Sequence, residues 1–303
     1  MNYYRPLLQY LIGLSILLSF SIFTKVGFLN LLGQAALFTL VVCIPILRTG
    51  RMSYVDIGWP WGLVVLGLIS YMFSEGYWVR SLIISSMVIL VGLRMGLGAL
   101  KLWSAGYLQK EFPRYEYQRI LWKEEGKGNT QLALQIDAIT QGLANASFLA
   151  LPVFITASNK NEAFSSIEVL GISIWLCALI FESIADTQKL RFLKKMKKEG
   201  SNNQVCNVGL WKYSRHPNYF SEWMVWNGLI ITSLPSLVVL ESNGSIQWYL
   251  LGGALLYASK MMYTTLVYTT GAVPSEHFSA MKRPEYAKYQ ATTSRFFPAP
   301  PKK

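Results

Sequence analysis

Polar residues able to bind an anionic or polar ligand are concentrated in one stretch, Gly209–Glu222, with the sequence GLWKYSRHPNYFSE. It contains one of only two histidines, His216, directly after Arg215. A guanidinium is permanently charged and its fork of N–H groups matches phosphate or carboxylate. An imidazole donates or accepts hydrogen bonds near neutral pH. We interpret this stretch as a binding site for an anionic or polar group.

Pro217 follows this pair, and proline is favoured at the first position of a helix because it lacks an N–H. The residues after it are apolar for about twenty positions. The chain as a whole is 52% hydrophobic and only 15% charged, with a mean hydropathy of +0.31. A soluble protein carries charge on about a quarter of its residues. We therefore predict that the polar stretch lies where a charged loop enters a membrane helix.

The fold class predicted is all-α: a polytopic membrane bundle of about eight transmembrane helices. Runs of about 20 apolar residues are long enough to cross a bilayer. Proline in a membrane helix favours a kink or a break, and Pro60 and Pro235 lie inside two of the runs. The predicted spans are residues 7–24, 29–47, 57–74, 81–100, 132–156, 167–185, 218–240 and 246–270.

An even number of spans places both termini on one side of the membrane. Of the 28 Lys and Arg residues, 23 fall on the side of the termini and 3 in the opposite loops. Basic residues are retained on the cytoplasmic side. We expect both termini in the cytoplasm, and a bacterial inner (cytoplasmic) membrane protein whose binding site faces the cytoplasm.

A second group of polar residues follows the sixth predicted span. The run DTQKLRFLKKMKK, from Asp186 to Lys198, has six basic residues and begins four positions after Glu182. Lysines at a membrane boundary commonly contact anionic lipid headgroups. The carboxylates and Gln188 favour in addition a pocket that binds sugar hydroxyls and phosphates.

A third group is a polar stripe in the fifth span. Asp137, Gln141 and Asn145 are four residues apart, so they share one helix face. Two interpretations remain open: hydrogen bonding between helices and a functional polar group inside the membrane.

Several classes of protein and site are disfavoured. The chain lacks a GxGxxG motif after a strand, a P-loop, a GxSxG elbow and HExxH. Three widely spaced cysteines and two histidines indicate neither a disulfide framework nor a metal centre. The net charge of +12 follows the membrane topology, so we expect no nucleic-acid partner.

These motifs resemble those of the steroid 5-alpha-reductase-like membrane proteins, in particular the bacterial branch known as domain of unknown function 1295 (DUF1295). The resemblance rests on GLWKYSRHPNYFSEWMVWNG, on ESIADTQKLRF and on the tail RPEYAKYQATTSRFFPAPPK, and more loosely on FPRYEYQRILW and VDIGWPWG. Ser221 stands where the branch more often has glycine. Residues 1–50 form an unmatched N-terminal helical pair, and 51–303 form the matched domain, with its cofactor-binding half at about 182–303.

The resemblance implies an integral-membrane oxidoreductase that uses NADPH to reduce a C=C bond of a lipid-like substrate, such as a sterol or another enone, in lipid metabolism. Asp186 would bind the ribose or adenosine end, and Lys189 and Arg191 the phosphates. The nicotinamide and pyrophosphate would be lined by Tyr213, Arg215, His216, Asn218, Tyr219 and Glu222. Tyr286 would close the pocket, with Arg283 and Tyr289 as further candidates.

The proton donor has to come from elsewhere, and Asp56 is the candidate. It lies at the mouth of a proline-containing span beside Trp59 and Trp61. Burial can keep such a carboxyl protonated. A role in helix capping or packing is the alternative for the same residue.

Two other functions stay open. Membrane methyltransferases of the isoprenylcysteine and phospholipid type share an Arg-His-Pro-x-Tyr motif that contacts S-adenosylmethionine. A non-catalytic protein that binds membrane lipids is the third alternative. Asn218, Glu222 and the ADTQK segment favour the reductase. The substrate and the oligomeric state are not indicated by these residues.

Overall fold

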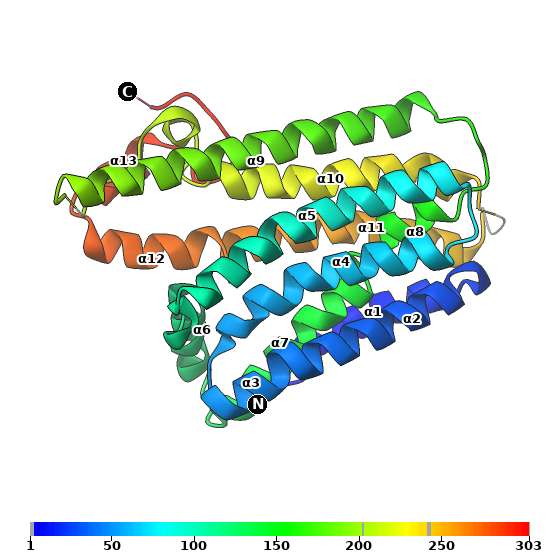
Figure 1. Cartoon of the computed structure of the whole chain (residues 1–303), viewed down its shortest axis with the longest axis horizontal. Coiled ribbons are helices and arrows are strands. Elements are labelled where there is room, and N and C mark those ends of the chain that lie inside the picture. The colour runs from blue at the N-terminus through cyan, green and yellow to red at the C-terminus, as the bar shows by residue number, and fades with distance from the viewer. Residues whose placement is uncertain (1–2, 202, 241–243, 303) are drawn as a thin grey trace. The chain divides into compact units, whose positions relative to one another are not determined.

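The structure is a computed structural model that describes residues 3–201, 203–240 and 244–302. Every regular element in these ranges is a helix (Figure 1). The chain divides into two compact units that interleave along the sequence. Unit 1 comprises Met1–Leu170 and Leu229–Ala258, and unit 2 comprises Gly171–Gly228 and Ser259–Lys303.

Unit 1 contains the N-terminal helices and a segment that returns from later in the chain. A π-helical turn, Thr39–Cys43, joins α2 to α3 without a break. A 3₁₀ turn at Met52–Tyr54 leads into α4, and another at Tyr107–Gln109 precedes α6. The α-helices are α1 (Arg5–Leu18), α2 (Ser21–Phe38), α3 (Ile44–Thr49), α4 (Val55–Phe73), α5 (Trp78–Ser104), α6 (Pro113–Glu124), α7 (Thr130–Ala146) and α8 (Leu151–Ala157), with parts of α9, α10 and α11.

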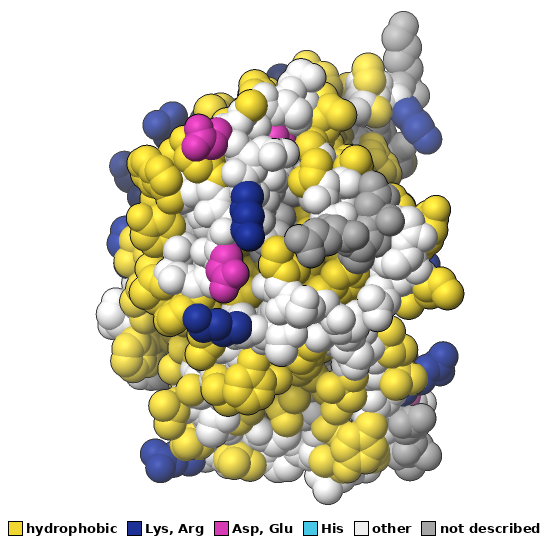
Figure 2. Space-filling view, turned by 90° about the vertical axis from the view of Figure 1, so that its right-hand side faces the viewer, with side chains coloured by type: hydrophobic (Ala, Val, Ile, Leu, Met, Phe, Trp, Pro, Cys, Tyr) yellow, Lys and Arg dark blue, Asp and Glu magenta, His cyan; other side chains and the backbone are white. Residues whose placement is uncertain are grey.

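Five helical segments in the described ranges are long and apolar enough to cross a membrane. The protein is therefore a multi-pass membrane protein, as its composition predicts. Hydrophobic and uncharged atoms predominate on the face shown in Figure 2, where charged side chains are few. The five segments are Ser21–Thr49, Met52–Phe73, Trp78–Ser104, Thr130–Ala157 and Ser166–Lys198.

The N-terminal boundary differs from the one expected. The first helix ends at Leu18, where the Ser19 hydroxyl donates to the Ile16 carbonyl at 2.7 Å, and α2 begins at Ser21. With 14 residues, α1 spans roughly 21 Å, less than a hydrocarbon core of about 30 Å. Lys25, expected between two helices, lies inside α2 with its ammonium 5.9 Å from the centroid of the Phe73 ring.

Pro60 and Pro235 do not break their helices, since α4 and α10 continue through them. Around Pro60, carbonyls of α4 accept hydrogen bonds from other helices. Asn145 Nδ2 donates to the Trp59 carbonyl at 3.0 Å, and Gln34 Nε2 donates to the Gly62 carbonyl at 2.8 Å. Asn145, fully buried, thus has the helix-joining role that was one interpretation of the polar stripe.

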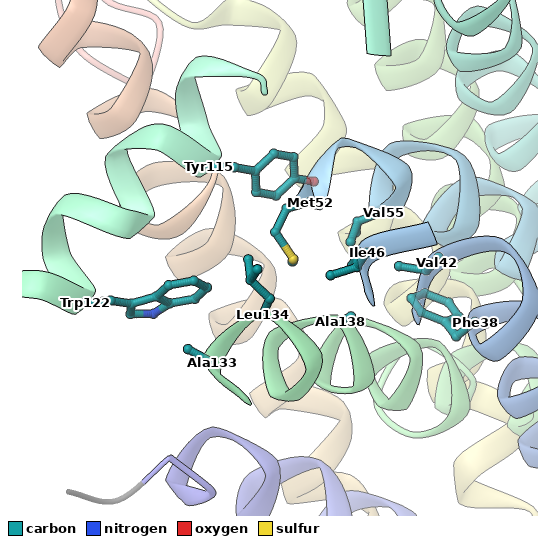
Figure 3. Packing of buried hydrophobic residues seen from close by; sticks show 10 residues of the cluster. All are labelled: Phe38, Val42, Ile46, Met52, Val55, Tyr115, Trp122, Ala133, Leu134 and Ala138. Atoms are coloured by element: carbon teal, nitrogen blue, oxygen red, sulfur yellow. The ribbon is translucent and has the colours of Figure 1, made fainter. Parts of the chain in front are cut away.

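A hydrophobic cluster holds α6 against the helices around it. Its members come from the stretch that runs from the last residue of α2 to the first residue of α4, from α6 and from α7, as Figure 3 shows. Tyr115 and Trp122, seven residues apart on α6, are both buried in it. The cluster consists of Phe38, Val42, Ile46, Met52, Val55, Tyr115, Trp122, Ala133, Leu134 and Ala138. It fixes the position of the Tyr115 phenol beside the first turn of α4.

A buried ion pair holds the loop before α9 in unit 1. Arg80 Nε lies 2.7 Å from Glu168 Oε1, and both side chains are almost fully buried. The same guanidinium donates to the carbonyls of Asn161 and Ala163 and lies 4.6 Å from the centroid of the Phe164 ring.

Unit 2 is built on α9 (Ser166–Lys198) and α10 (Pro217–Val238). Pro217 is the first residue of α10, which confirms the predicted start. The 3₁₀ turn Gly209–Lys212 is fixed on α9, because Trp211 Nε1 donates to the Ala185 carbonyl at 2.9 Å. Past α11 (Ile246–Thr264) and a π-helical turn, Thr265–Thr269, the unit is completed by α12 (Ala272–Lys282) and α13 (Tyr286–Thr292).

Position 209 requires a glycine. Its φ is +54°, in the left-handed region that favours glycine. A Cβ at this position would lie 2.4 Å from the Gln188 side chain. Gln188 Oε1 accepts from the Leu210 N–H at 2.9 Å, so this contact fixes the loop that leads to His216.

We expect Arg80→Leu to destabilise the protein by about 3–5 kcal/mol, because it leaves the Glu168 carboxylate buried without its cation. Thermal unfolding in detergent measures the change. Lys160→Ala, an exposed cation in the same loop, is the control and should unfold like the wild type. The double variant Arg80→Leu/Glu168→Leu should recover part of the loss. Equal melting of Arg80→Leu and Lys160→Ala would contradict this role for the ion pair.

Candidate functional site

Two of the predicted site residues meet across α9 and α10 in unit 2. Asn218 Nδ2, in the first turn of α10, donates to Asp186 Oδ1 on α9 at 3.1 Å. The amide oxygen of Asn218 is buried and has no hydrogen-bond partner among the residues that the structure describes. A buried amide oxygen without a donor is costly. The pair is therefore suited to accept a hydrogen bond from a bound N–H or O–H group.

Glu276 on α12 is the centre of a second group of contacts. Its carboxylate pairs with Arg215 through both oxygens, with Nε to Oε1 at 2.7 Å and Nη2 to Oε2 at 3.2 Å. His216 Nε2 lies 3.1 Å from Oε1. Gln290 and Arg295 donate to Oε2 at 3.1 and 3.3 Å. One carboxylate thus joins the Arg-His pair to the C-terminal segment.

The protonation states in this group follow from burial and charge. Burial alone would raise the pKa of Glu276, but hydrogen bonds from His216 and Arg215 and the charge of Arg215 outweigh it and lower that pKa to about 2. Burial also lowers the pKa of His216, so its imidazole is neutral at neutral pH. Because an ionised carboxylate only accepts hydrogen bonds, His216 Nε2 carries the proton and donates.

The segment after α13 pairs with the loop before α10. The Arg215 N–H donates to the Ser294 carbonyl at 2.8 Å, and the Ala299 N–H donates to the Tyr213 carbonyl at 2.9 Å. The Ser214 hydroxyl donates to the Phe296 carbonyl at 2.9 Å and accepts from the His216 N–H at 3.1 Å. This side-by-side pairing fixes the backbone of residues 213–216.

Arg215, expected to bind a phosphate, instead makes side-chain contacts within the protein. Besides Glu276, its Nη1 donates to the carbonyls of Gln290 and Thr293 at 2.9 and 2.6 Å. Four N–H groups of the guanidinium are used in this way. In this structure Arg215 holds the C-terminal segment on the loop.

The other predicted cations differ in their surroundings. Lys189 Nζ lies 4.4 Å from the centroid of the Trp211 ring, and Arg191 is exposed. Arg283 donates to the Gln204 carbonyl and to Ser279 Oγ, both at 3.1 Å.

The predicted aromatic site residues differ in their exposure and in their contacts. Tyr213 is 47% exposed. Tyr219 stacks on His216, with ring centroids 5.3 Å apart and planes within 4°. Tyr286 and Tyr289 are buried in edge-to-face contact, and the Tyr289 hydroxyl donates to the Trp211 carbonyl. Glu222 is half-buried one helical turn after Asn218.

Asp56 belongs to unit 1, in the first turn of α4. The Tyr115 hydroxyl donates to Asp56 Oδ1 at 2.6 Å, and Arg114 forms an ion pair with Oδ2. Asp56 is therefore held by one hydrogen bond and one ion pair at the N-terminus of α4. Burial, followed by the charge of Asp56, raises the pKa of Tyr115 far above its ordinary value, so the phenol remains protonated.

Glu276, Gln290, Arg114 and Tyr115 are site residues that the sequence patterns did not single out. Arg215 lies 61 positions from Glu276, and Asp56 lies 59 from Tyr115. The signal available for Glu276 was that it is one of only two carboxylates in the basic segment after residue 270.

The chain matches the family described as Protein of unknown function (DUF1295) over residues 36–293. It belongs to this family. An uncharacterised protein of Schizosaccharomyces pombe is 23% identical over 166 residues, which cover 50% of this chain and 44% of that protein. The chain thus aligns with less than half the length of this relative. No solved structure matches the chain significantly.

We expect Glu276→Gln to destabilise unit 2 by about 3–5 kcal/mol, because Arg215 would stay buried without its carboxylate. Thermal unfolding and protease cleavage near residue 295 measure the effect. Glu285→Gln, on an exposed carboxylate of the same segment, is the control.

The same ion pair sets a pH dependence. The pKa of Glu276 falls from an ordinary 4.5 to about 2 on folding. The contribution of the ionised Glu276 to the free energy of unfolding is complete above about pH 4.5. It is lost as the pH falls towards 2. Wild-type protein should therefore lose more stability over this interval than Glu276→Gln. Identical pH profiles would contradict the assignment.

Proposed function

We propose that this DUF1295 protein is an NADPH-dependent membrane oxidoreductase that reduces a C=C bond of a lipid-like substrate. The observation that carries the proposal is the contact between Asp186 and Asn218. They lie 32 positions apart in two separate motifs, both of which the resemblance assigns to the cofactor.

The residues present fit such a cofactor. The Asn218 amide oxygen is buried and lacks a donor, and a ribose hydroxyl or the nicotinamide amide has the donor it needs. Asp186 accepts from Asn218 and so orients this amide. Tyr213 is exposed in the loop whose backbone is fixed, and Arg191 is an exposed cation two residues after Lys189.

The candidate residues then divide into those that bind the cofactor and those that hold the loop in place. NADPH supplies the hydride when bound. Asp186 and Asn218 bind hydroxyl or amide groups, and Lys189, Arg191 and Arg283 attract phosphates. Arg215 and His216 keep the wall of the pocket in place through Glu276, and Tyr219 packs on His216. Tyr286 and Tyr289 hold the C-terminal segment against the loop that precedes α10.

We propose that Tyr115, positioned by Asp56, donates the proton that accompanies hydride transfer to the C=C bond. The phenol is protonated and buried, and its hydrogen bond to Asp56 fixes its orientation. In this pair the carboxylate positions the phenol, and the phenol holds the proton. This refines the sequence-based assignment of Asp56 as the acid.

We also propose that the chain crosses the membrane about eight times, with α1, α10 and α11 completing the five apolar segments. The 14-residue α1 is shorter than the hydrocarbon core, so it would cross with local thinning of the bilayer. Both termini and the residues around His216 would face the cytoplasm, since 23 of 28 basic residues lie on that side. A bacterial inner membrane fits this arrangement.

Cofactor binding by the purified protein in detergent tests the proposal, with NADPH and S-adenosylmethionine measured side by side. We expect NADPH to bind, and Asn218→Ala or Asp186→Asn to weaken it by about ten- to a hundredfold, the range for hydrogen bonds that involve a charged group. Thr187→Ala, the exposed neighbour of Asp186, should bind like the wild type.

Binding of S-adenosylmethionine alone would instead indicate a methyltransferase. If neither ligand binds, the protein does not use these residues for a cofactor of this kind, and a lipid-binding role without catalysis is favoured.

Labelling of a single cysteine tests the topology. Cys43, Cys177 and Cys206 are replaced by serine, and Lys198→Cys is introduced at the exposed end of α9. We expect a membrane-impermeant maleimide to label this cysteine in inside-out vesicles and not in intact cells. Labelling in intact cells would reverse the orientation.

A further inference from the structure

Unit 2 contains a groove of about 490 Å³ between α9 and α10. One wall is formed by Ile174, Cys177 and Phe181 of α9, and the other by Phe220, Ser221 and Met224 of α10. Leu210 and Tyr213 lie at the loop between the two helices. A volume in this range is typical of a small-molecule site.

The lining selects a hydrocarbon ligand. None of the residues that line the groove carries a charge, so a nucleotide lying along it would have no cation among them to pair with its phosphates. The hydroxyl of Ser221 already donates to the Pro217 carbonyl at 2.9 Å. An occupant with polar groups along its length would leave those groups unpaired at a cost. The groove therefore differs from the neighbouring Asp186–Asn218 pair in the chemistry it accepts.

The groove is continuous with the surface that α9 presents to lipid. α9 is one of the five apolar segments able to span the membrane, and only 28% of its most apolar window is buried within the protein. Cys177 and Phe181 line the groove and are themselves exposed. Leu176 and Ile180, exposed on the same stretch, do not line it. An occupant therefore enters from the bilayer.

The loop that contributes Leu210 and Tyr213 to the groove also contains a cation suited to a phospholipid headgroup. Lys212 is exposed and lies in sequence between Leu210 and Tyr213, both of which line the groove. A lysine at the membrane boundary attracts an anionic headgroup by about 1 kcal/mol. Tyr213 combines an apolar ring with a hydroxyl, which suits the boundary between headgroup and chain.

We propose that this groove binds one acyl chain of an anionic membrane phospholipid, with the headgroup phosphate at Lys212. The groove shares Tyr213 with the residues assigned to NADPH, but its other lining residues are not among them, so lipid binding there does not depend on the proposed reaction. A lipid held there would fill the space between α9 and α10 next to the loop that precedes His216.

Photocrosslinking in vesicles tests this. The protein is reconstituted with a phosphatidylglycerol that carries a diazirine on one acyl chain, and labelled peptides are identified by mass spectrometry. Cys177→Trp fills the groove, and Leu176→Trp adds the same side chain at the neighbouring exposed position outside it. Met224→Trp fills the groove from α10.

We expect wild-type label on Ile174, Phe181, Phe220 and Met224, and at least about a fivefold decrease in Cys177→Trp and Met224→Trp, because an indole occupies the volume of the chain. Leu176→Trp should retain the label. Lys212→Gln should lower it by about fivefold, while Lys198→Gln should not. Thermal unfolding of each variant identifies those that still fold.

The proposal is overturned if folded Cys177→Trp and Leu176→Trp are labelled equally, since the lipid is then only part of the shell around the protein. Binding of NADPH by Cys177→Trp at the wild-type affinity would show that the groove and the cofactor residues are independent.

Discussion

The buried charge of Arg215 is the constraint on which unit 2 depends. A guanidinium that is 7% exposed needs a carboxylate and acceptors for its remaining N–H groups. Glu276 and the carbonyls of Gln290 and Thr293 meet this need. The C-terminal segment is thereby held against the loop before α10. Because that loop leads directly into Pro217, the same contacts set the direction of α10 and bring Asn218 to Asp186.

Unit 1 uses a carboxylate in a similar way at the start of α4. Glu111 accepts from the backbone N–H groups of Met52 and Ser53 at 2.9 and 3.1 Å, and it pairs with Arg119 at 3.0 Å. These N–H groups have no partner within their own helix. The contact ties the segment before α6 to the entry of α4, and the hydrophobic cluster then presents Tyr115 to Asp56. In both units a carboxylate distant in sequence fixes the entry to a helix that carries candidate site residues.

Properties set by local composition could be predicted, and properties set by distant partners could not. Apolar runs of about 20 residues indicated the membrane class, and Pro217 marked the start of α10. The motifs brought Asp186 and Asn218 into the same prediction, and the structure places them in contact. The partner of Arg215 was missed because an ion pair across 61 residues leaves no periodic pattern. The end of α1 was missed because Ser19 terminates the helix without a change in hydropathy.

The separation of Arg215 from Glu276 also orders events during biosynthesis. At about 5–20 residues per second, Glu276 is made roughly 3 to 12 s after Arg215. In that interval Arg215 has neither its carboxylate nor the carbonyls of residues 290 and 293, so it has to stay hydrated. The segment that returns to unit 1, Leu229–Ala258, is synthesised in between. The nascent chain therefore supplies the last helical segment of the first unit before the second can close.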